Sequence, residues 1–149
     1  MDQNPQFALA SEYLHYTNKN IFLTGKAGTG KTTFLRSLKA SLTKRMIIVA
    51  PTGIAAINAG GTTIHSFFQL PFAPFLPNNA NQRNYAFSKE KVQIMQTLDV
   101  LVIDEISMVR ADTLDNIDQI LRQYRIGSQP FGGVQLLMIG DLFQLAPVV

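Results

Sequence analysis

Four short apolar runs divide the chain, and each is followed by turn residues or by a polar cluster. We expect them to form buried strands over residues 21–24, 46–50, 99–103 and 134–139. The stretches between them carry helical signals, and apolar strands separated by helices are typical of a parallel sheet covered on both faces. The pattern therefore predicts an α/β domain of three layers, with a mainly parallel sheet and helices on both faces.

The intervening helices are predicted from apolar residues spaced three or four apart and from capping residues. They are expected over residues 5–17, 30–42, 54–58, 89–97 and from 112 to the residue before Gly127. Asn4 and Pro5 suit the N-cap and the first position of the first helix, and Asp112 suits the N-cap of the last one.

One long irregular segment is expected inside this domain. Residues 67–84 hold three prolines among phenylalanines and then become rich in asparagine, which predicts a long loop. The sequence shows no repeats and no linker, so residues 1–149 are predicted to form a single domain. Because the chain ends within ten residues of the last predicted strand, we expect it to be a fragment of a longer protein.

The composition excludes several classes of protein. Hydrophobic residues make up 46% of the chain and charged residues 15%, which excludes intrinsic disorder. The absence of cysteine excludes a disulfide framework, a thiolate zinc site and a cysteine nucleophile. Neither a signal peptide nor a membrane-spanning run is found, so we expect a cytoplasmic protein with no membrane partner.

Charge is distributed unevenly along the chain. Up to Lys91 there are 10 basic residues and three acidic ones, whereas the remainder holds three basic and seven acidic residues. A basic first part suits phosphate or nucleic acid. Solvated lysines scattered over the surface would explain the same count equally well.

The most specific motif is the segment GKAGTGKT at residues 25–32, between a predicted strand and a predicted helix. Glycine frees successive backbone N–H groups to form a concave anion site, and the following helix adds positive potential. Lys31 is expected to reach the β- and γ-phosphates of a nucleotide, and the Thr32 hydroxyl to bind Mg²⁺. The predicted nucleotide-binding residues are Gly25, Ala27, Gly28, Thr29, Gly30, Lys31 and Thr32.

A second motif ends the third predicted strand with two adjacent carboxylates, Asp104 and Glu105. In nucleoside triphosphatases with such a loop, the aspartate holds Mg²⁺ directly or through water. The neighbouring glutamate can act as the general base that polarises the attacking water. The pair therefore predicts hydrolysis of the nucleotide as well as binding.

A third, weaker signal is Gln144, which follows the last predicted strand. An amide at that place could contact the γ-phosphate and report hydrolysis to a bound partner. A glutamine at a strand end is more often simply solvated, so this residue carries little weight by itself.

The fourth signal is the segment of residues 51–68, which is rich in small and hydroxyl-bearing residues after a strand. Such residues allow a sugar-phosphate chain to approach closely, and His65 or Phe67 could stack on a base. The alternatives remain open, because a lone histidine is often structural and Phe67 and Phe68 are often core residues.

Together the four motifs resemble the first motor domain of superfamily 1 DNA helicases of the Pif/RecD type. The matching segments are GKAGTGKT (25–32), APTGIAAINAGGTTIHSFF (50–68), VIDEISMV (102–109) and FGGVQLLMIGDLFQLAPV (131–148). The second and fourth segments are specific to this branch, whereas many ATPases share the other two.

The resemblance implies a RecA-like P-loop domain, hydrolysis of ATP with Mg²⁺, and 5′-to-3′ translocation on single-stranded DNA. By position, it gives the nucleotide roles to Lys31, Thr32, Asp104, Glu105 and Gln144. It places Thr52, Gly53, His65 and Ser66 in the segments that face DNA. The family also contacts adenine with an N-terminal glutamine, for which Gln3 and Gln6 are candidates.

The family's second RecA-like domain, expected in the same longer chain, supplies arginines that reach the γ-phosphate. We therefore expect this fragment to bind nucleotide, to hydrolyse it poorly and to unwind nothing. Two other functions remain open: a P-loop ATPase that acts on protein partners without nucleic acid, and a binder of single strands without useful turnover. Segment 50–68 counts against the first and Glu105 against the second. Replacement of Lys44 by alanine, taken as a surface change, is expected to have little effect on ATP binding or hydrolysis.

Overall fold

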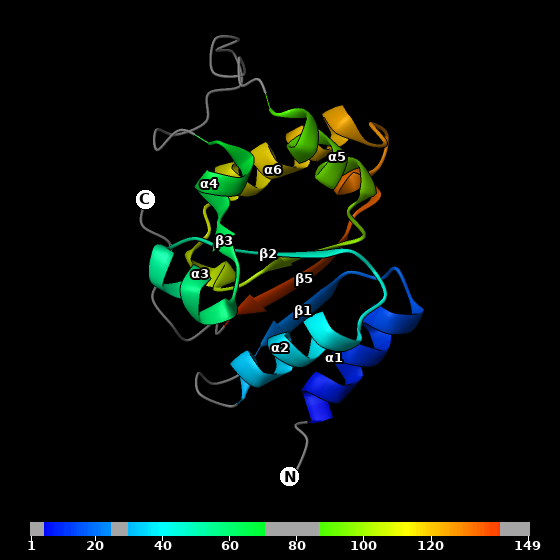
Figure 1. The fold of residues 1–149 in the computed structure, drawn as a ribbon, viewed down its shortest axis with the longest axis vertical. Coiled ribbons are helices and arrows are strands. Elements are labelled where there is room, and N and C mark those ends of the chain that lie inside the picture. The colour runs from blue at the N-terminus through cyan, green and yellow to red at the C-terminus, as the bar shows by residue number, and fades with distance from the viewer. Residues whose placement is uncertain (1–4, 25–29, 71–86, 141–149) are drawn as a thin grey trace.

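The computed structural model describes residues 5–24, 30–70 and 87–140, which form a parallel sheet between two layers of helices (Figure 1). The sheet has the order β1-β5-β4-β2-β3, and every neighbouring pair is parallel. Its strands are β1 (Ile21–Thr24), β2 (Met46–Ala50), β3 (Thr62–Thr63), β4 (Val100–Ile103) and β5 (Gln135–Gly140). The predicted fold class and all four predicted strands are confirmed, and β3 is an addition. This strand escaped prediction because two threonines form no apolar run.

The helices divide between the two faces of the sheet. Figure 1 shows α1 and α2 below the sheet and α5 and α6 above it. The first face is covered by α1 (Pro5–Tyr16), α2 (Lys31–Ser41) and α3 (Gly53–Ala59). The second is covered by α4 (Ile64–Phe68), α5 (Lys89–Thr97) and α6 (Ala111–Tyr124). Among the described residues, the 3₁₀ turn η2 (Ile106–Met108) lies between β4 and α6, and the 3₁₀ turn η3 (Pro130–Gly133) lies between α6 and β5.

Strand β4 shows why an apolar run correctly predicted a central strand. All four of its residues are fully buried. Val100 and Val102 pack into the core beneath α1 and α2, whereas Leu101 and Ile103 pack into the core beneath α5 and α6. Alternate side chains of a strand point to opposite faces, so a strand covered on both faces must be apolar throughout.

The start of α6 corrects one prediction. Asp112 was expected at the N-cap, but the helix begins at Ala111 and its N-cap residue is Arg110. Asp112 lies in the first turn, where its Oδ1 accepts hydrogen bonds from Arg110 Nε and from the Thr113 backbone N–H, both at 3.0 Å. A carboxylate in the first turn interacts favourably with the helix dipole. Asp112 therefore correctly indicated the N-terminal end of this helix, but it lies within the first turn and not at the N-cap.

The first two residues of the predicted long loop are helical instead. Phe67 and Phe68 belong to α4, and their buried rings meet edge to face at 4.9 Å between centroids. Ile64, Phe67 and Phe68 share one helical face and are all buried, which explains why this segment forms a helix. Residues 71–84 of the predicted loop lie outside the described residues.

Lys44 was expected to be a surface residue, and this was wrong. Its Nζ donates to Thr17 O at 2.7 Å and to Gln135 Oε1 at 3.0 Å. The Gln135 side chain is buried, and its Nε2 donates to Lys19 O at 2.7 Å. Lys44 thus belongs to a polar network that ties the start of β5 to the end of α1, away from the sheet edge described next.

None of the helices in the described ranges is long and apolar enough to cross a membrane.

Candidate active site at the carboxyl edge of the sheet

The residues with chemical potential gather where the parallel strands end. β4 leads into Asp104, β2 leads into Thr52, and β3 leads directly into α4. The Asp104 N–H donates to Val49 O at 2.9 Å, which extends the pairing of β4 with β2 beyond the strand itself. Ligands of open α/β sheets bind at this edge.

Lys31 joins the first turn of α2 to the end of β4. Its Nζ lies 3.2 Å from Asp104 Oδ1 and 3.2 Å from Glu105 Oε1. The contact with Glu105 is a hydrogen bond, whereas the contact with Asp104 is an ion pair without hydrogen-bond geometry. The structure therefore brings together three residues that the sequence placed in the nucleotide site. We call Lys31, Asp104 and Glu105 the phosphate-site triad.

Burial and pairing act in opposite directions on the pKa of Asp104 and on the pKa of Lys31. Asp104 is 2% exposed, and burial raises the pKa of its carboxyl although the Lys31 ammonium offsets part of the effect. Burial also lowers the pKa of Lys31, but the two carboxylates outweigh it, so that pKa is raised. Asp104 is thus an unfavourably buried anion, for which a further cation would be stabilising.

The backbone at Glu105 carries strain that the sequence did not reveal. Glu105 adopts φ 54° and ψ 47°, a left-handed conformation that is uncommon for residues other than glycine. The next residue is held closely, because a Cβ atom at Gly140 would fall 2.6 Å from Ile106 Cγ2. Gly140 thus lets the end of β5 approach η2, and it is a site residue that sequence reasoning missed. The only signal was a glycine directly after an apolar strand.

The oxygen atoms near Lys31 fit a bound Mg²⁺ ion. Asp104 Oδ1 is buried and accepts no hydrogen bond from the described residues, and Thr32 lies beside Lys31 at the start of α2. A buried carboxylate oxygen without a hydrogen-bond donor suits a divalent cation. The described residues hold no cluster of three or more acidic, histidine or cysteine side chains. Mg²⁺ requires none, since it binds through one or two protein oxygens together with phosphates.

The phosphate loop itself is only partly described. Gly30 precedes α2 with φ 88°, a conformation that glycine adopts without strain. The other predicted loop residues Gly25, Ala27, Gly28 and Thr29 lie outside the described residues, as does Gln144.

Two of the predicted DNA-facing residues start α3. Thr52 is the N-cap, and its Oγ1 accepts a hydrogen bond from the Ala55 N–H at 3.2 Å. The hydroxyl proton is left to donate elsewhere. Gly53 follows at an exposed position, and a Cβ atom there would meet no atom of the described residues within 4 Å. Packing against the described part of the domain therefore gives no reason for glycine at this position.

The other two residues that were predicted to face DNA lie on α4, which starts in the same way. Its N-cap is Thr63, whose Oγ1 accepts from the Ser66 N–H at 3.1 Å. Ser66 is exposed and His65 is half-buried. Phe67, in contrast, is 7% exposed, so the alternative in which it stacks on a base is wrong and its core role is confirmed.

The paired glycines 60 and 61 are among the small residues of segment 51–68, which were expected to let a sugar-phosphate chain approach closely. Instead, the Gly60 and Gly61 N–H groups donate to Ile57 O at 3.2 Å and to Ala56 O at 2.9 Å. A Cβ atom at Gly61 would lie 2.2 Å from Ile48 O. These glycines end α3 and allow the chain to cross β2 closely, so their role is internal.

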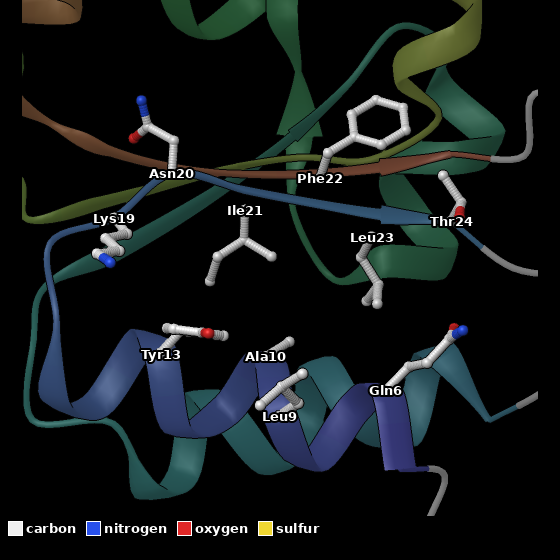
Figure 2. A pocket seen from close by; sticks show the side chains of 10 residues that line it. All are labelled: Gln6, Leu9, Ala10, Tyr13, Lys19, Asn20, Ile21, Phe22, Leu23 and Thr24. Carbon is white, nitrogen blue, oxygen red and sulfur yellow. The ribbon is translucent and has the colours of Figure 1, made fainter.

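A pocket of about 470 Å³ lies between α1 and β1 (Figure 2). Ile21 and Leu23 point toward α1, whereas Phe22 points to the opposite side of the strand. Gln6 and Thr24 lie at the same end of this pocket, the end from which β1 leads to residue 25. Of the two candidate adenine-contacting glutamines, Gln6 therefore lies close to the start of the phosphate loop, and Gln3 lies outside the described residues.

A family model described as PIF1-like helicase matches residues 2–149, nearly the whole chain. The chain belongs to the PIF1-like helicase family. The resemblance read from the four motifs is confirmed.

Relatives of this PIF1-like chain are similar in sequence and in structure. It is 41% identical over 136 residues to the ATP-dependent DNA helicase PIF1 of Saccharomyces cerevisiae (strain YJM789). The matched region covers 87% of this chain and 16% of that protein. The structure of Bacteroides Pif1 bound to ssDNA matches 100% of this chain and 34% of its own, with TM-score 0.89 and 49% identity. Bacteroides sp Pif1 in complex with ADP-AlF4 matches the same shares, with TM-score 0.89 and 48% identity. The chain thus spans about a third of those solved chains and a smaller share of the curated relative.

Within this PIF1-like domain, the sheet order places the phosphate-site triad and the residues predicted to face DNA at the ends of neighbouring strands. β4 carries two members of the phosphate-site triad, and its neighbour β2 leads to Thr52 and Gly53. β3, on the far side of β2, leads to His65 and Ser66. One edge of one sheet therefore holds both sets of residues.

Proposed function

We propose that the chain is the ATP-binding domain of an ATP-dependent 5′-to-3′ DNA helicase, which couples hydrolysis of ATP with Mg²⁺ to translocation on single-stranded DNA. The observation that carries this proposal is the phosphate-site triad, assembled at the sheet edge where β2 and β3 also end. The relatives are named as ATP-dependent DNA helicases, and their solved structures include complexes with ssDNA and with ADP-AlF4.

Each residue of the site has a role under this proposal. Lys31 leaves the two carboxylates and clamps the β- and γ-phosphates, while the loop glycines and Gly30 turn backbone N–H groups toward them. Thr32 and Asp104 would hold Mg²⁺, which when bound neutralises charge on the phosphates. Glu105, released from Lys31, accepts a proton from the attacking water as general base. Gln144 is proposed to contact the γ-phosphate and Gln6 to contact adenine.

The DNA-facing residues act at the neighbouring strand ends. The Thr52 and Ser66 hydroxyls are proposed to donate to DNA phosphates, contacts that position a strand without reading its sequence. Gly53 allows the backbone of the strand to approach α3 closely. His65 is proposed to stack on a base.

A second RecA-like domain is proposed to complete the ATP site from elsewhere in a longer chain. The length of the relatives supports this, since this chain covers only 16% of the yeast PIF1 protein. Arginines supplied across such an interface raise turnover by about 10³–10⁵-fold in other P-loop enzymes. The low charged fraction of 15% also fits a face that meets another domain.

The test is the steady-state ATPase rate of the full-length protein at low salt, with and without a single-stranded DNA oligonucleotide. We expect strong stimulation by DNA, loss of both rates in Lys31→Ala, and no change in Arg36→Ala, an exposed residue on the same helix. High activity indifferent to DNA would contradict the proposal and favour an ATPase that acts on protein partners. Unwinding of duplexes with a 5′ tail but not a 3′ tail would establish the direction.

A further inference from the structure

Helix α4 is too short to be stable by itself. It has five residues, and the first turn of any helix is costly to form because several dihedral angles are fixed for one hydrogen bond. Its N-terminal end is held by Thr63, and its C-cap residue Gln69 is left-handed, with φ 53°. Neighbouring elements must therefore hold the helix that carries His65 and Ser66.

Lys91 of α5 makes the contact that holds its C-terminal end. The Lys91 Nζ donates to Phe67 O at 2.9 Å, a carbonyl in the last turn that has no partner within the helix. The same ammonium lies 4.6 Å from the centroid of the Phe67 ring, in cation–π contact. A cation at a helix C-terminus is also favoured by the helix dipole. One side chain thus fixes both the backbone and the ring of Phe67.

The surroundings of Lys91 show that this contact is built at a cost. Burial lowers the pKa of Lys91, so its charged form is partly desolvated. A solvated lysine on the surface would avoid that cost. The carbonyl and the ring of Phe67 compensate it, and Phe67 is itself buried in the core shared by α4, α5 and α6.

The position of Phe67 makes the contact relevant to the DNA-facing residues. Phe67 directly follows Ser66 in one helical turn, so a displacement of its carbonyl also turns the Ser66 hydroxyl and the His65 ring. Lys91 lies on α5, outside the segments that follow β2 and β3. Its link to His65 and Ser66 runs through Phe67, the residue of α4 that it contacts.

We propose that Lys91 is a positioning residue for single-stranded DNA: it fixes the last turn of α4 through Phe67 and thereby orients His65 and Ser66. This inference rests on the proposed function and adds to it a residue that contacts no DNA.

The test uses the full-length protein and an oligothymidylate. Lys91→Met keeps the aliphatic stem and removes the donor, and Lys91→Arg keeps a charged donor able to stack on an aromatic ring. Lys89→Met is the matched control, because Lys89 is an exposed lysine on the same helix and its replacement removes the same charge. For each variant we would measure the ATPase rate without DNA, the DNA concentration for half-maximal stimulation, and the dependence of that concentration on salt.

In Lys91→Met, the half-saturating DNA concentration is expected to rise about tenfold, which corresponds to about 1.4 kcal/mol. The ATPase rate without DNA and the salt dependence should remain those of the unmodified protein, and Lys89→Met should match it throughout. Lys91→Arg should recover most of the loss, and it keeps the test decisive if Lys91→Met does not fold.

Three results would overturn the inference. If Lys91→Met lowers the melting temperature but leaves the half-saturating DNA concentration unchanged, Lys91 is purely structural. If the salt slope falls by about 0.7, the value for one phosphate contact on a single strand, Lys91 binds DNA directly. If the unmodified protein shows no stimulation by DNA, the proposed function fails and this inference fails with it.

Discussion

The Lys31 ammonium lies 3.2 Å from the buried carboxylate of Asp104, although each residue is proposed to bind a different part of Mg²⁺-ATP. In the absence of nucleotide, each therefore serves as the counter-ion of the other. Under the proposed function, Lys31 would leave Asp104 for the phosphates of a bound nucleotide, and Asp104 would instead hold Mg²⁺. The move of Lys31 would also release Glu105, whose hydrogen bond to Lys31 otherwise occupies the proposed general base.

Replacement of Lys31 should therefore affect stability as well as activity. In the full-length protein, Lys31→Ala is expected to abolish ATP hydrolysis because the phosphate clamp is lost. In the absence of nucleotide it also leaves Asp104 buried without its cation, which should destabilise the domain by about 1–3 kcal/mol. Urea unfolding at neutral pH measures the second effect, with Arg36→Ala as control. An unchanged unfolding midpoint would show that the ion pair contributes nothing to folding.

Glu105→Gln separates binding from chemistry. The amide oxygen can still accept the hydrogen bond from Lys31, so the geometry of the triad should survive. Loss of the general base is expected to lower kcat by about 10²–10⁴-fold while the affinity for ATP is retained. Single-turnover hydrolysis and binding of a fluorescent ATP analogue measure the two quantities. Normal hydrolysis by this variant would exclude Glu105 as the base.

The raised pKa of Asp104 has a definite consequence for the pH dependence of stability. The folded carboxyl holds its proton more tightly than the unfolded one, whose pKa is 3.8, so its contribution to stability falls as pH rises from 3.8 through the folded pKa. Asp104→Asn removes that loss. We expect the variant to be at least as stable as the unmodified domain at neutral pH, with the difference disappearing in acid.

The measurement is urea unfolding of both proteins in the absence of nucleotide, from acid to neutral pH. Lys31 has its pKa raised above 10.5, so its own contribution persists over this range and is lost only as pH rises through the folded value. Mg²⁺-ADP should raise the melting temperature of the unmodified domain and have little effect on Asp104→Asn. A variant that loses stability relative to the unmodified domain as pH rises would show that pairing with Lys31 outweighs burial.

The sequence predicted those parts of the fold that follow from periodicity. The strand of residues 46–50 and the helix of residues 89–97 were predicted with the bounds that the structure has, because apolar runs and capping signals delimit both. Strand β3 was missed because its two threonines pair with Val49 and Ala50 without any pattern of their own. The surface position expected for Lys44 was wrong because it depends on a buried partner, Gln135, that lies 91 positions away in the sequence.

The candidate site was predictable where a motif fixes residue types at fixed spacing. Lys31, Asp104 and Glu105 were named in that way, and the structure brings them together. The left-handed backbone at Glu105 was not predictable, since glutamate has no preference for that conformation. The contact of Lys91 with Phe67 was equally invisible, because it depends on how α5 packs on α4. Tertiary packing decides such features.

Gly53 and Gly61 distinguish a glycine kept for a ligand from one kept for the fold. A methyl group at Gly53 would extend into open space, so Gly53→Ala should change the stability of the domain by less than about 0.5 kcal/mol. In the full-length protein it should nevertheless raise the DNA concentration for half-maximal ATPase stimulation, because the methyl group would lie where the DNA strand is proposed to approach. At Gly61 the same methyl group would meet Ile48 O at 2.2 Å, and Gly61→Ala should cost about 1–3 kcal/mol of stability. If Gly53→Ala binds DNA as the unmodified protein does, the DNA strand does not pass close to the start of α3. The proposed role of Gly53 as a DNA-facing residue would then be wrong.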